Sequence, residues 1–573
     1  MVLLPIEAVL TVAAILVALL APNLGSCWFE RIETGFRNVA RRRVLSVLLV
    51  AMSALVARAV VLPIRPVPMP QVGDEFSHLL LADTLLHERL ANPTPPLWEH
   101  FETLSVNMRP TYASVYPPVQ GIFLASGRLL TGHPFFGVML SVAVMCGAIC
   151  WMLQGWMSAE WALLGGLLAV LRFGMFTYWA DGYMGGAPSA IGGALALGAL
   201  PRIKDNFRAR DAVILAIGFA VLANTRPYEG FVLSLLIGVA LLYWLFRDRS
   251  IGLRKIFRNF VAPMLIVLVI AGLAMGYYFW RVTGSPLRTP YQVNWETYGM
   301  MPKFIWQSLR PNQPVALRHD ALNDSYHVWE FDTYANIRTL NGLLIEWAIR
   351  LIRNWGFYLG PILTLPLFAA MATAPYGFGW KKLDRNTRFL ILSATVFVAG
   401  LAVEVFSYPH YAAPITCIII ALVLIAMRAL RAQAHRGKAF GLALTRAIAI
   451  VCVLMLALRA VAVPLHIPMA RAILTSSYDA VRDDIPSNKV EALLENTPGQ
   501  HLLIVHYVPG SQDWMGWVYN CADIDHSKIV RAWDMGPEKN RELVDYFRDR
   551  QAWFVNASDK VPVLRPYIDE ASR

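Results

Sequence analysis

An acidic pair, Asp74 and Glu75, follows Gly73 directly after an apolar stretch of the sequence. Carboxylates have unperturbed pKa values of about 3.9 to 4.3, so at neutral pH they are ionised and can take a proton from a hydroxyl group. At a membrane surface such a group can act on a lipid-linked substrate. The structural alternative is that Asp74 caps a helix N-terminus and that Glu75 is a solvated first-turn acid.

The residues after the acidic pair predict an amphipathic helix that begins near Asp74 and lies along the membrane interface. Its apolar positions are Phe76, Leu79, Leu80, Leu86 and Leu90. The polar segment then continues through His78, Arg109 and Tyr116-Pro117-Pro118 to a second short amphipathic stretch. We treat His78, Arg109 and Tyr116 as candidate substrate-binding residues.

Further candidate residues lie at the ends of later apolar spans and in a long polar segment between them. The cations among them suit a phosphate group, although a snorkelling side chain or a solvated loop is the structural alternative. The acids can bind an acceptor or hold a divalent ion together with Glu75 or His78, and no spacing is specific for a metal, so no metal is assigned. These candidates are Asp181, Arg226, Glu229, Arg288, Lys303 and His410.

The composition is that of an integral membrane protein. Of 573 residues, 56% are hydrophobic and only 16% are charged, which is too apolar for an ordinary soluble protein. The net charge of +12 comes from short basic runs between apolar spans, so it indicates topology and excludes nucleic acid as a partner. The sequence has no Walker A and no G-x-G-x-x-G motif, so no nucleotide cofactor is predicted.

A membrane-crossing helix needs about 20 apolar residues to span a hydrocarbon layer of about 30 Å. This rule predicts about 12 transmembrane helices. They lie near residues 2–22, 44–63, 135–156, 160–180, 186–201, 211–225, 229–246, 259–281, 356–375, 388–407, 410–430 and 441–464.

The basic loops predict the orientation of these spans, because Lys and Arg collect in cytoplasmic loops. If the N-terminus is outside, every strongly basic loop lies on the cytoplasmic side. Residues 64–134 and 282–355 then form two external loops of a transmembrane domain that covers 1–464. The remaining 465–573 form an external α/β domain. It contains strand-like runs at His501–Val508, Lys528–Trp533 and Gln551–Asn556 and a helix-like run at Glu538–Asp549.

With these motifs the chain resembles the GT-C glycosyltransferases, in particular the branch of dolichyl-phosphate-mannose protein mannosyltransferases and bacterial aminoarabinose and galacturonic acid transferases. In that family the first external loop begins with an acidic motif, matched by Asp74-Glu75. It later carries an aromatic or basic residue before a Pro-Pro pair, matched by Tyr116-Pro117-Pro118. Two departures are a missing lysine before the Pro-Pro pair and an additional N-terminal span.

The resemblance implies a GT-C-like fold and an enzyme that transfers a sugar from a polyprenyl-phosphate donor to an acceptor hydroxyl, with inversion. Asp74 and Glu75 are then the catalytic residues, and the acceptor is a lipid, a glycan or a protein. The site faces the periplasm or exterior of a bacterial inner membrane, surrounded by membrane lipids, and a divalent cation is left open as a cofactor. Two alternatives are a transporter or flippase of a lipid-linked glycan and an inactive relative that binds a glycan or a partner through its C-terminal tail.

Overall fold

The structure is a computed structural model of the full chain. It describes residues 3–247, 251–310, 316–372, 379–433, 439–462, 464–465, 467, 486–510 and 516–568. Several predicted features extend beyond these residues: the end of the ninth span, Lys438 in a basic loop, part of the second external loop at 311–315, and 468–485, 511–515 and 569–573 of the predicted C-terminal domain.

Each of the predicted spans overlaps a helix. These helices are α1 (Leu3–Leu20), α3 (Arg43–Val61), α6 (Phe135–Leu153), α7 (Ala159–Phe173), α8 (Ala187–Asn206), α9 (Ala209–Ala223), α10 (Pro227–Arg247), α12 (Ala262–Thr283), α17 (Gly360–Ala372), α18 (Arg385–Leu401), α19 (Thr416–Arg431) and α20 (Phe440–Ala462). Among the described residues, seven helical segments are long and apolar enough to cross a membrane. The count of about 12 spans remains a prediction.

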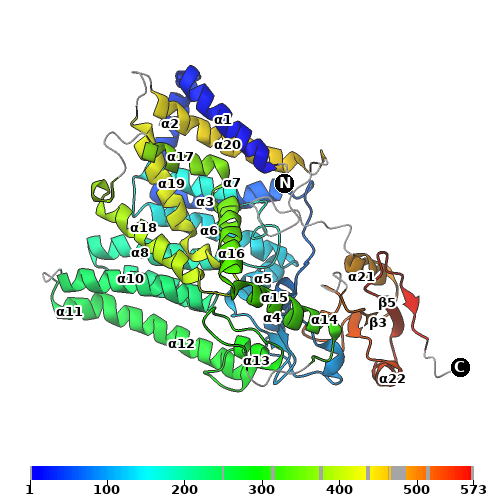
Figure 1. Ribbon diagram of the computed structural model, residues 1–573. Coiled ribbons are helices and arrows are strands. Elements are labelled where there is room, and N and C mark those ends of the chain that lie inside the picture. The colour runs from blue at the N-terminus through cyan, green and yellow to red at the C-terminus, as the bar shows by residue number, and fades with distance from the viewer. Residues whose placement is uncertain are drawn as a thin grey trace.

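Short elements occupy the bundle ends where basic loops were predicted. They are α2 (Ser26–Ala40), α11 (Leu253–Ile256), the π-helix η2 (Phe257–Val261) and the 3₁₀ turn η4 (Trp380–Lys382). In Figure 1 α11 lies at the left of the bundle and the C-terminal residues lie at the right. The helix α2 packs on α3 and α7, which the sequence pattern did not predict.

The fourth span was predicted to continue to residue 180, but α7 ends at Phe173. Residues 174–184 form consecutive turns and bends and are buried. Four glycines in this stretch and its continuation, at 174, 182, 185 and 186, lower its helix propensity. Buried loop backbone needs hydrogen-bond partners, and the backbone of Tyr183 finds them in the side chains of Glu75 and Gln120.

The two predicted external loops contain helices that pack against the bundle. The first holds α4 (Gly73–Leu86), the 3₁₀ helix η1 (Trp98–Phe101), β1 (Val106–Asn107), β2 (Ala113–Ser114) and α5 (Val119–Thr131). The second holds α13 (Pro290–Thr297), α14 (Asp320–Asn323), the π-helix η3 (Asp324–Trp329), α15 (Glu330–Ile337) and α16 (Leu340–Tyr358). Hydropathy alone did not predict α16, because only one of its faces is apolar.

The C-terminal residues form a four-stranded sheet in the order β4-β3-β5-β6. Its elements are α21 (Pro486–Asn496), β3 (His501–His506), β4 (Ile529–Trp533), α22 (Pro537–Tyr546), β5 (Gln551–Asn556) and β6 (Arg565–Pro566). The central β3 is parallel to β4 and β5, and β6 is antiparallel to β5. The three strands predicted from sequence agree with β3, β4 and β5 to within two residues.

This C-terminal sheet packs on residues of the first predicted external loop, beside α14 in Figure 1. The indole of Trp533 donates to the carbonyl oxygen of Glu102 at 2.7 Å, and His100 Nδ1 lies 3.0 Å from the carbonyl oxygen of Trp533. The Asp83 carboxylate accepts a hydrogen bond from the backbone of Ala522 at 2.7 Å and a second from Arg128 of α5 at 2.8 Å. The sheet, α4 and α5 are therefore joined through one buried carboxylate.

Close contact between α5 and α6 depends on glycine. A Cβ added to Gly137 of α6 would lie 1.9 Å from the carbonyl oxygen of Phe123 in α5, and one added to Gly127 would lie 2.0 Å from the backbone nitrogen of Gly137. Neither contact can be relieved by a side-chain rotation. This packing fixes α5, which leads out of the Tyr116-Pro117-Pro118 motif.

We therefore predict that Gly137→Ala destabilises the protein by at least roughly 1–3 kcal/mol, because the two helices must separate. Gly238→Ala in α10 is the matched control, since a Cβ there meets nothing within 4 Å. Thermal denaturation of both purified variants in detergent tests this. Equal melting temperatures for the two variants would contradict the close α5–α6 contact.

Candidate active site

The N-terminus of α4 is anchored by Glu75. Its carboxylate accepts hydrogen bonds from the backbone N–H groups of Gln71 (2.7 Å), Val72 (3.3 Å) and Tyr183 (2.7 Å). Val72 is the N-cap, so Glu75 occupies the third helical position, from which a glutamate reaches back to the cap. Burial raises the pKa of Glu75, while these hydrogen bonds oppose the rise. Glu75 therefore performs the capping role that the sequence pattern offered to Asp74.

Asp74 lies one residue earlier and takes no part in this cap. Its Oδ1 accepts a hydrogen bond from the hydroxyl of Ser105 at 2.9 Å, and the hydroxyl of Tyr116 is within hydrogen-bonding reach. The Asp74 side chain is partly exposed, unlike that of Glu75. An ionised carboxylate held by neutral hydroxyl donors retains lone pairs that can accept a proton.

His78 follows Asp74 by four residues, so both project from one face of α4. The imidazole stacks on the Tyr116 ring with centroids 4.3 Å apart. Burial, with a further contribution from Arg226, lowers the pKa of His78 to about 3, so the ring is neutral at physiological pH. Its Nδ1 atom is buried and has no hydrogen-bond partner among the residues that the structure describes.

His78, Tyr116 and Arg226 line a small cavity, which measures about 20 Å³. The residues that line it are His78, Tyr116, Pro117, Gln120, Met184, Gly185, Pro188, Ser189, Thr225 and Arg226. The guanidinium of Arg226 lies 4.3 Å from the ring centroid of Tyr411 and 3.6 Å from the carboxylate of Glu229. Arg226 is 17% exposed and Glu229 is 4% exposed, so this cation is held in place at the edge of the cavity.

Lys303 extends the line of cations and aromatic rings. Its Nζ lies 4.6 Å from the ring centroid of Tyr291, and that ring meets Tyr116 edge-on at 5.5 Å. The Lys303 carbonyl oxygen accepts a hydrogen bond from the backbone N–H of Val405 at 2.9 Å. This bond joins Lys303 to the segment that follows α18. The side chain of Glu404 in that segment is nearly buried.

His410 is the middle residue of the 3₁₀ turn η5 (Pro409–Tyr411), which leads through a second 3₁₀ turn, η6 (Ala413–Ile415), into α19. Its backbone N–H donates to the Tyr178 hydroxyl at 2.9 Å, and that hydroxyl lies 2.9 Å from His410 Nδ1. Burial lowers the pKa of His410 well below its ordinary value, and Arg226 and His78 add to this effect. His410 therefore connects the buried 174–186 segment to the turn that presents Tyr411.

Three predicted site residues have other surroundings. Asp181 is fully buried and pairs with Arg58 Nη2 at 2.9 Å and Arg65 Nη2 at 2.8 Å. Arg109 lies over the Trp98 ring at 4.4 Å, and Arg288 pairs with Glu296. The structure therefore brings together Asp74, His78, Tyr116, Arg226, Glu229, Lys303 and His410, with Glu75 directly behind them.

Two contributors were missed in the sequence. Ser105 bonds Asp74 from a left-handed backbone conformation (φ 57°), for which its sequence context gives no signal. Tyr519 of the C-terminal sheet stacks on Phe76 at 4.2 Å, and a Cβ on Gly73 would lie 2.7 Å from its hydroxyl. The glycine before the acidic pair is thus required by the close approach of Tyr519.

The sequence left open a divalent ion bound by Asp181 or Glu229 together with Glu75 or His78. Within the described ranges, no group of three or more His, Cys, Asp or Glu side chains is arranged to hold a metal ion. The donors observed around Asp74 are the hydroxyl groups of Ser105 and Tyr116.

No family model and no curated protein matches this sequence. Among solved structures, the chain is similar to the apo oligosaccharyltransferase of Archaeoglobus fulgidus, at 12% identity and a TM-score of 0.49, over 90% of this chain and 69% of that one. It is also similar to ArnT from Cupriavidus metallidurans, at 14% identity and a TM-score of 0.47, over 89% of this chain and 92% of that one. ArnT has been solved both in the apo state and bound to undecaprenyl phosphate.

The ion pairs of Asp181 lead to a prediction that separates structure from substrate binding. Removing one partner of a buried salt bridge costs about 3–5 kcal/mol, so Asp181→Asn should strongly lower the melting temperature. Asp205→Asn is the control, because that carboxylate is exposed at the end of α8. If Asp181→Asn melts like the wild-type protein but no longer binds substrate, Asp181 contacts the substrate and is no structural anchor.

Proposed function

We propose that this protein is a GT-C-type glycosyltransferase that moves a sugar from a polyprenyl-phosphate donor to an acceptor hydroxyl. The observation that carries the proposal is that the two acids of the pair have different contacts. Glu75 caps α4, which leaves the neighbouring carboxylate of Asp74 on the face of the helix that also carries His78. Tyr116, whose hydroxyl is within hydrogen-bonding reach of Asp74, lines one small cavity together with His78 and the cation Arg226.

In the proposed reaction, Asp74 takes the proton of the acceptor hydroxyl, and the oxygen attacks the anomeric carbon of the sugar. The bond from that carbon to the phosphate oxygen breaks in the same displacement, so the configuration inverts. The polyprenyl phosphate leaves with the electron pair and gains negative charge. Fixed cations near the leaving group stabilise this charge, and we assign this role to Arg226 and Lys303. Arg226 lines the cavity and Lys303 lies over the Tyr291 ring, which supports the assignment.

Other side chains position the substrate. The neutral His78 leaves its Nδ1 atom available to hydrogen-bond a sugar hydroxyl, and Tyr116 lies against it. Tyr291 and Tyr411 lie close enough to Asp74 and Arg226 to interact electrostatically with both side chains. Rings in these positions suit a sugar between the base and the phosphate. We assign Glu75 and Asp181 to positioning and leave Arg109 and Arg288 outside the reacting centre.

We also propose that the site faces the periplasm or exterior of a bacterial inner membrane. The basic runs follow α1, α8, α10 and α19, whereas Asp74, Arg226 and His410 are reached from the opposite ends of these or adjoining helices. The C-terminal sheet, whose domain role is part of this proposal, borders the site through Tyr519 and could select the acceptor. A flippase is less well supported, because the buried Arg172 is bound by the Gly356 and Phe357 carbonyls and pairs with Glu7.

We expect Asp74→Asn to lower the rate of sugar transfer by about 10²–10⁴-fold, because the amide keeps the shape but cannot take a proton. Donor binding and the melting temperature should stay close to wild type. Ser105→Ala is the control: it removes one hydrogen bond to Asp74 and should cost only roughly three- to tenfold in rate. Single-turnover transfer with a labelled donor measures both variants. Wild-type turnover by Asp74→Asn would rule out Asp74 as the base.

Arg226 provides the second test. Arg226→Ala should weaken donor binding and also slow transfer, because charge on the phosphate rises as the bond breaks. Arg226→Lys should recover only part of either loss, since an ammonium lacks the planar fork. A purely interfacial arginine predicts full recovery by lysine. Donor titrations and melting curves of both variants distinguish the two, with Arg288→Ala as the control. Unchanged donor affinity in Arg226→Ala would remove this residue from the site.

A further inference from the structure

A second, larger cavity lies at the other end of the bundle from Asp74. It measures about 620 Å³ and is enclosed by α2, α7, α19 and α20. The helix α2 ends at Ala40, just before α3 begins, whereas Asp74 follows the far end of α3. The 19 residues of α3 separate the two regions by about 28 Å at 1.5 Å per residue. The cavity is therefore distinct from the candidate active site, and its volume falls within the about 300–1,000 Å³ range of ligand sites.

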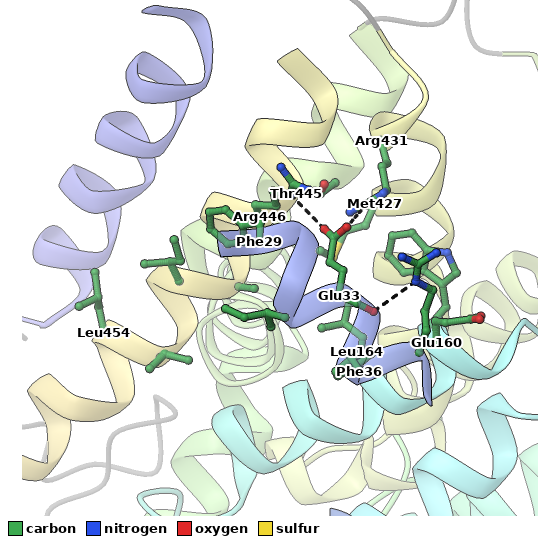
Figure 2. Close-up of a pocket in the computed structure, with 16 residues that line it drawn as sticks. Phe29, Glu33, Phe36, Glu160, Leu164, Met427, Arg431, Thr445, Arg446 and Leu454 are labelled. Carbon is green, nitrogen blue, oxygen red and sulfur yellow. Dashed lines mark hydrogen bonds and ion pairs between the residues drawn. The ribbon is translucent and has the colours of Figure 1, made fainter. Parts of the chain in front are cut away.

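One end of this cavity is charged and structured. Glu33 of α2 accepts hydrogen bonds from Arg431 at the end of α19 (2.9 Å) and from Arg446 of α20 (3.0 Å), as Figure 2 shows. Arg37 lies one turn further along α2, is exposed, and has no acidic partner in the described chain. With Glu160 also in the lining, three arginines and two glutamates give the rim a formal charge of +1.

The rest of the cavity is apolar and opens on the outer surface of α20. Ile450, Val453 and Leu454 line it and are 45%, 53% and 48% exposed. Figure 2 shows Leu454 further along α20 than Arg446, well away from the charged rim. The sequence from 447 to 458 contains no charged residue, so this surface suits hydrocarbon. A cationic rim above an apolar floor matches an amphiphile with an anionic head.

We propose that this cavity binds one phospholipid with an anionic headgroup from the surrounding leaflet. Its phosphate is bound by Arg37 and the outer face of Arg431, and an acyl chain lies over Ile450, Val453 and Leu454. The net positive rim favours an anionic over a zwitterionic lipid. The lipid fills the space between α2 and α20 and thereby stabilises the packing of α2 on the bundle. A soluble anion would leave the apolar floor uncovered.

Melting curves of the delipidated, purified protein test this with defined additions. Phosphatidylglycerol should raise the melting temperature more than phosphatidylethanolamine, and sodium phosphate alone should not raise it. Arg37→Ala should weaken the apparent affinity for phosphatidylglycerol about fivefold, as expected for losing one cation at a lipid headgroup. Val453→Trp should block the acyl chain and abolish the shift without changing the rim.

The matched controls are Arg41→Ala, an exposed arginine just after α2 and outside the cavity lining, and Leu273→Trp, on the exposed surface of α12. Both should keep the full shift, and native mass spectrometry should count one retained lipid in both but not in Val453→Trp. Equal shifts from the two lipids, a shift from phosphate alone, full retention in Val453→Trp, or a dimer mass in place of a lipid adduct would each overturn the proposal.

Discussion

The buried carboxylate of Glu75 is the constraint on which the candidate site depends. It holds three backbone N–H groups from two segments more than a hundred residues apart, and so joins the start of α4 to the turn at Tyr183. Each of these bonds gives a partner to a backbone donor that would be costly to bury without one. Without them the N-terminus of α4 and a buried non-helical segment would both lack partners. The orientation of Asp74 follows from this anchor.

The same buried segment is held from two further sides. Asp181 binds Arg58 and Arg65, and Tyr178 binds His410, so residues 174–186 connect α3 and α4 to the turn before α19. Ionisable groups inside a membrane protein are expensive and usually mark function. In our proposal Asp181 fixes the backbone around which the functional side chains converge. The acids that sequence position alone suggested as ligands thus differ in role, and burial and partners separate them.

Hydropathy predicted the positions of the helices that overlap the 12 proposed spans, because a span needs a long apolar run, and alternation predicted β3, β4 and β5. Hydropathy gave the wrong helix boundaries where tertiary packing determines them. The helix α7 ends before residue 180, and α16 forms in a segment without an apolar run. Within the site, the acidic motif and Arg226 could be predicted from their positions beside spans. The bonds from Tyr183 to Glu75 and from Ser105 to Asp74, and the approach of Tyr519 across more than 400 residues, are tertiary contacts that leave no local pattern.

The central claim is that the site consumes a polyprenyl-phosphate sugar. The most direct measurement is to incubate the purified protein with a panel of polyprenyl-phosphate sugars, each labelled in the sugar, together with membrane extract as the acceptor source. The account predicts that one donor loses its label to an acceptor while free polyprenyl phosphate accumulates in equal amount. It would be contradicted if every donor stayed intact while proteoliposomes containing the protein carried a lipid-linked glycan across the membrane.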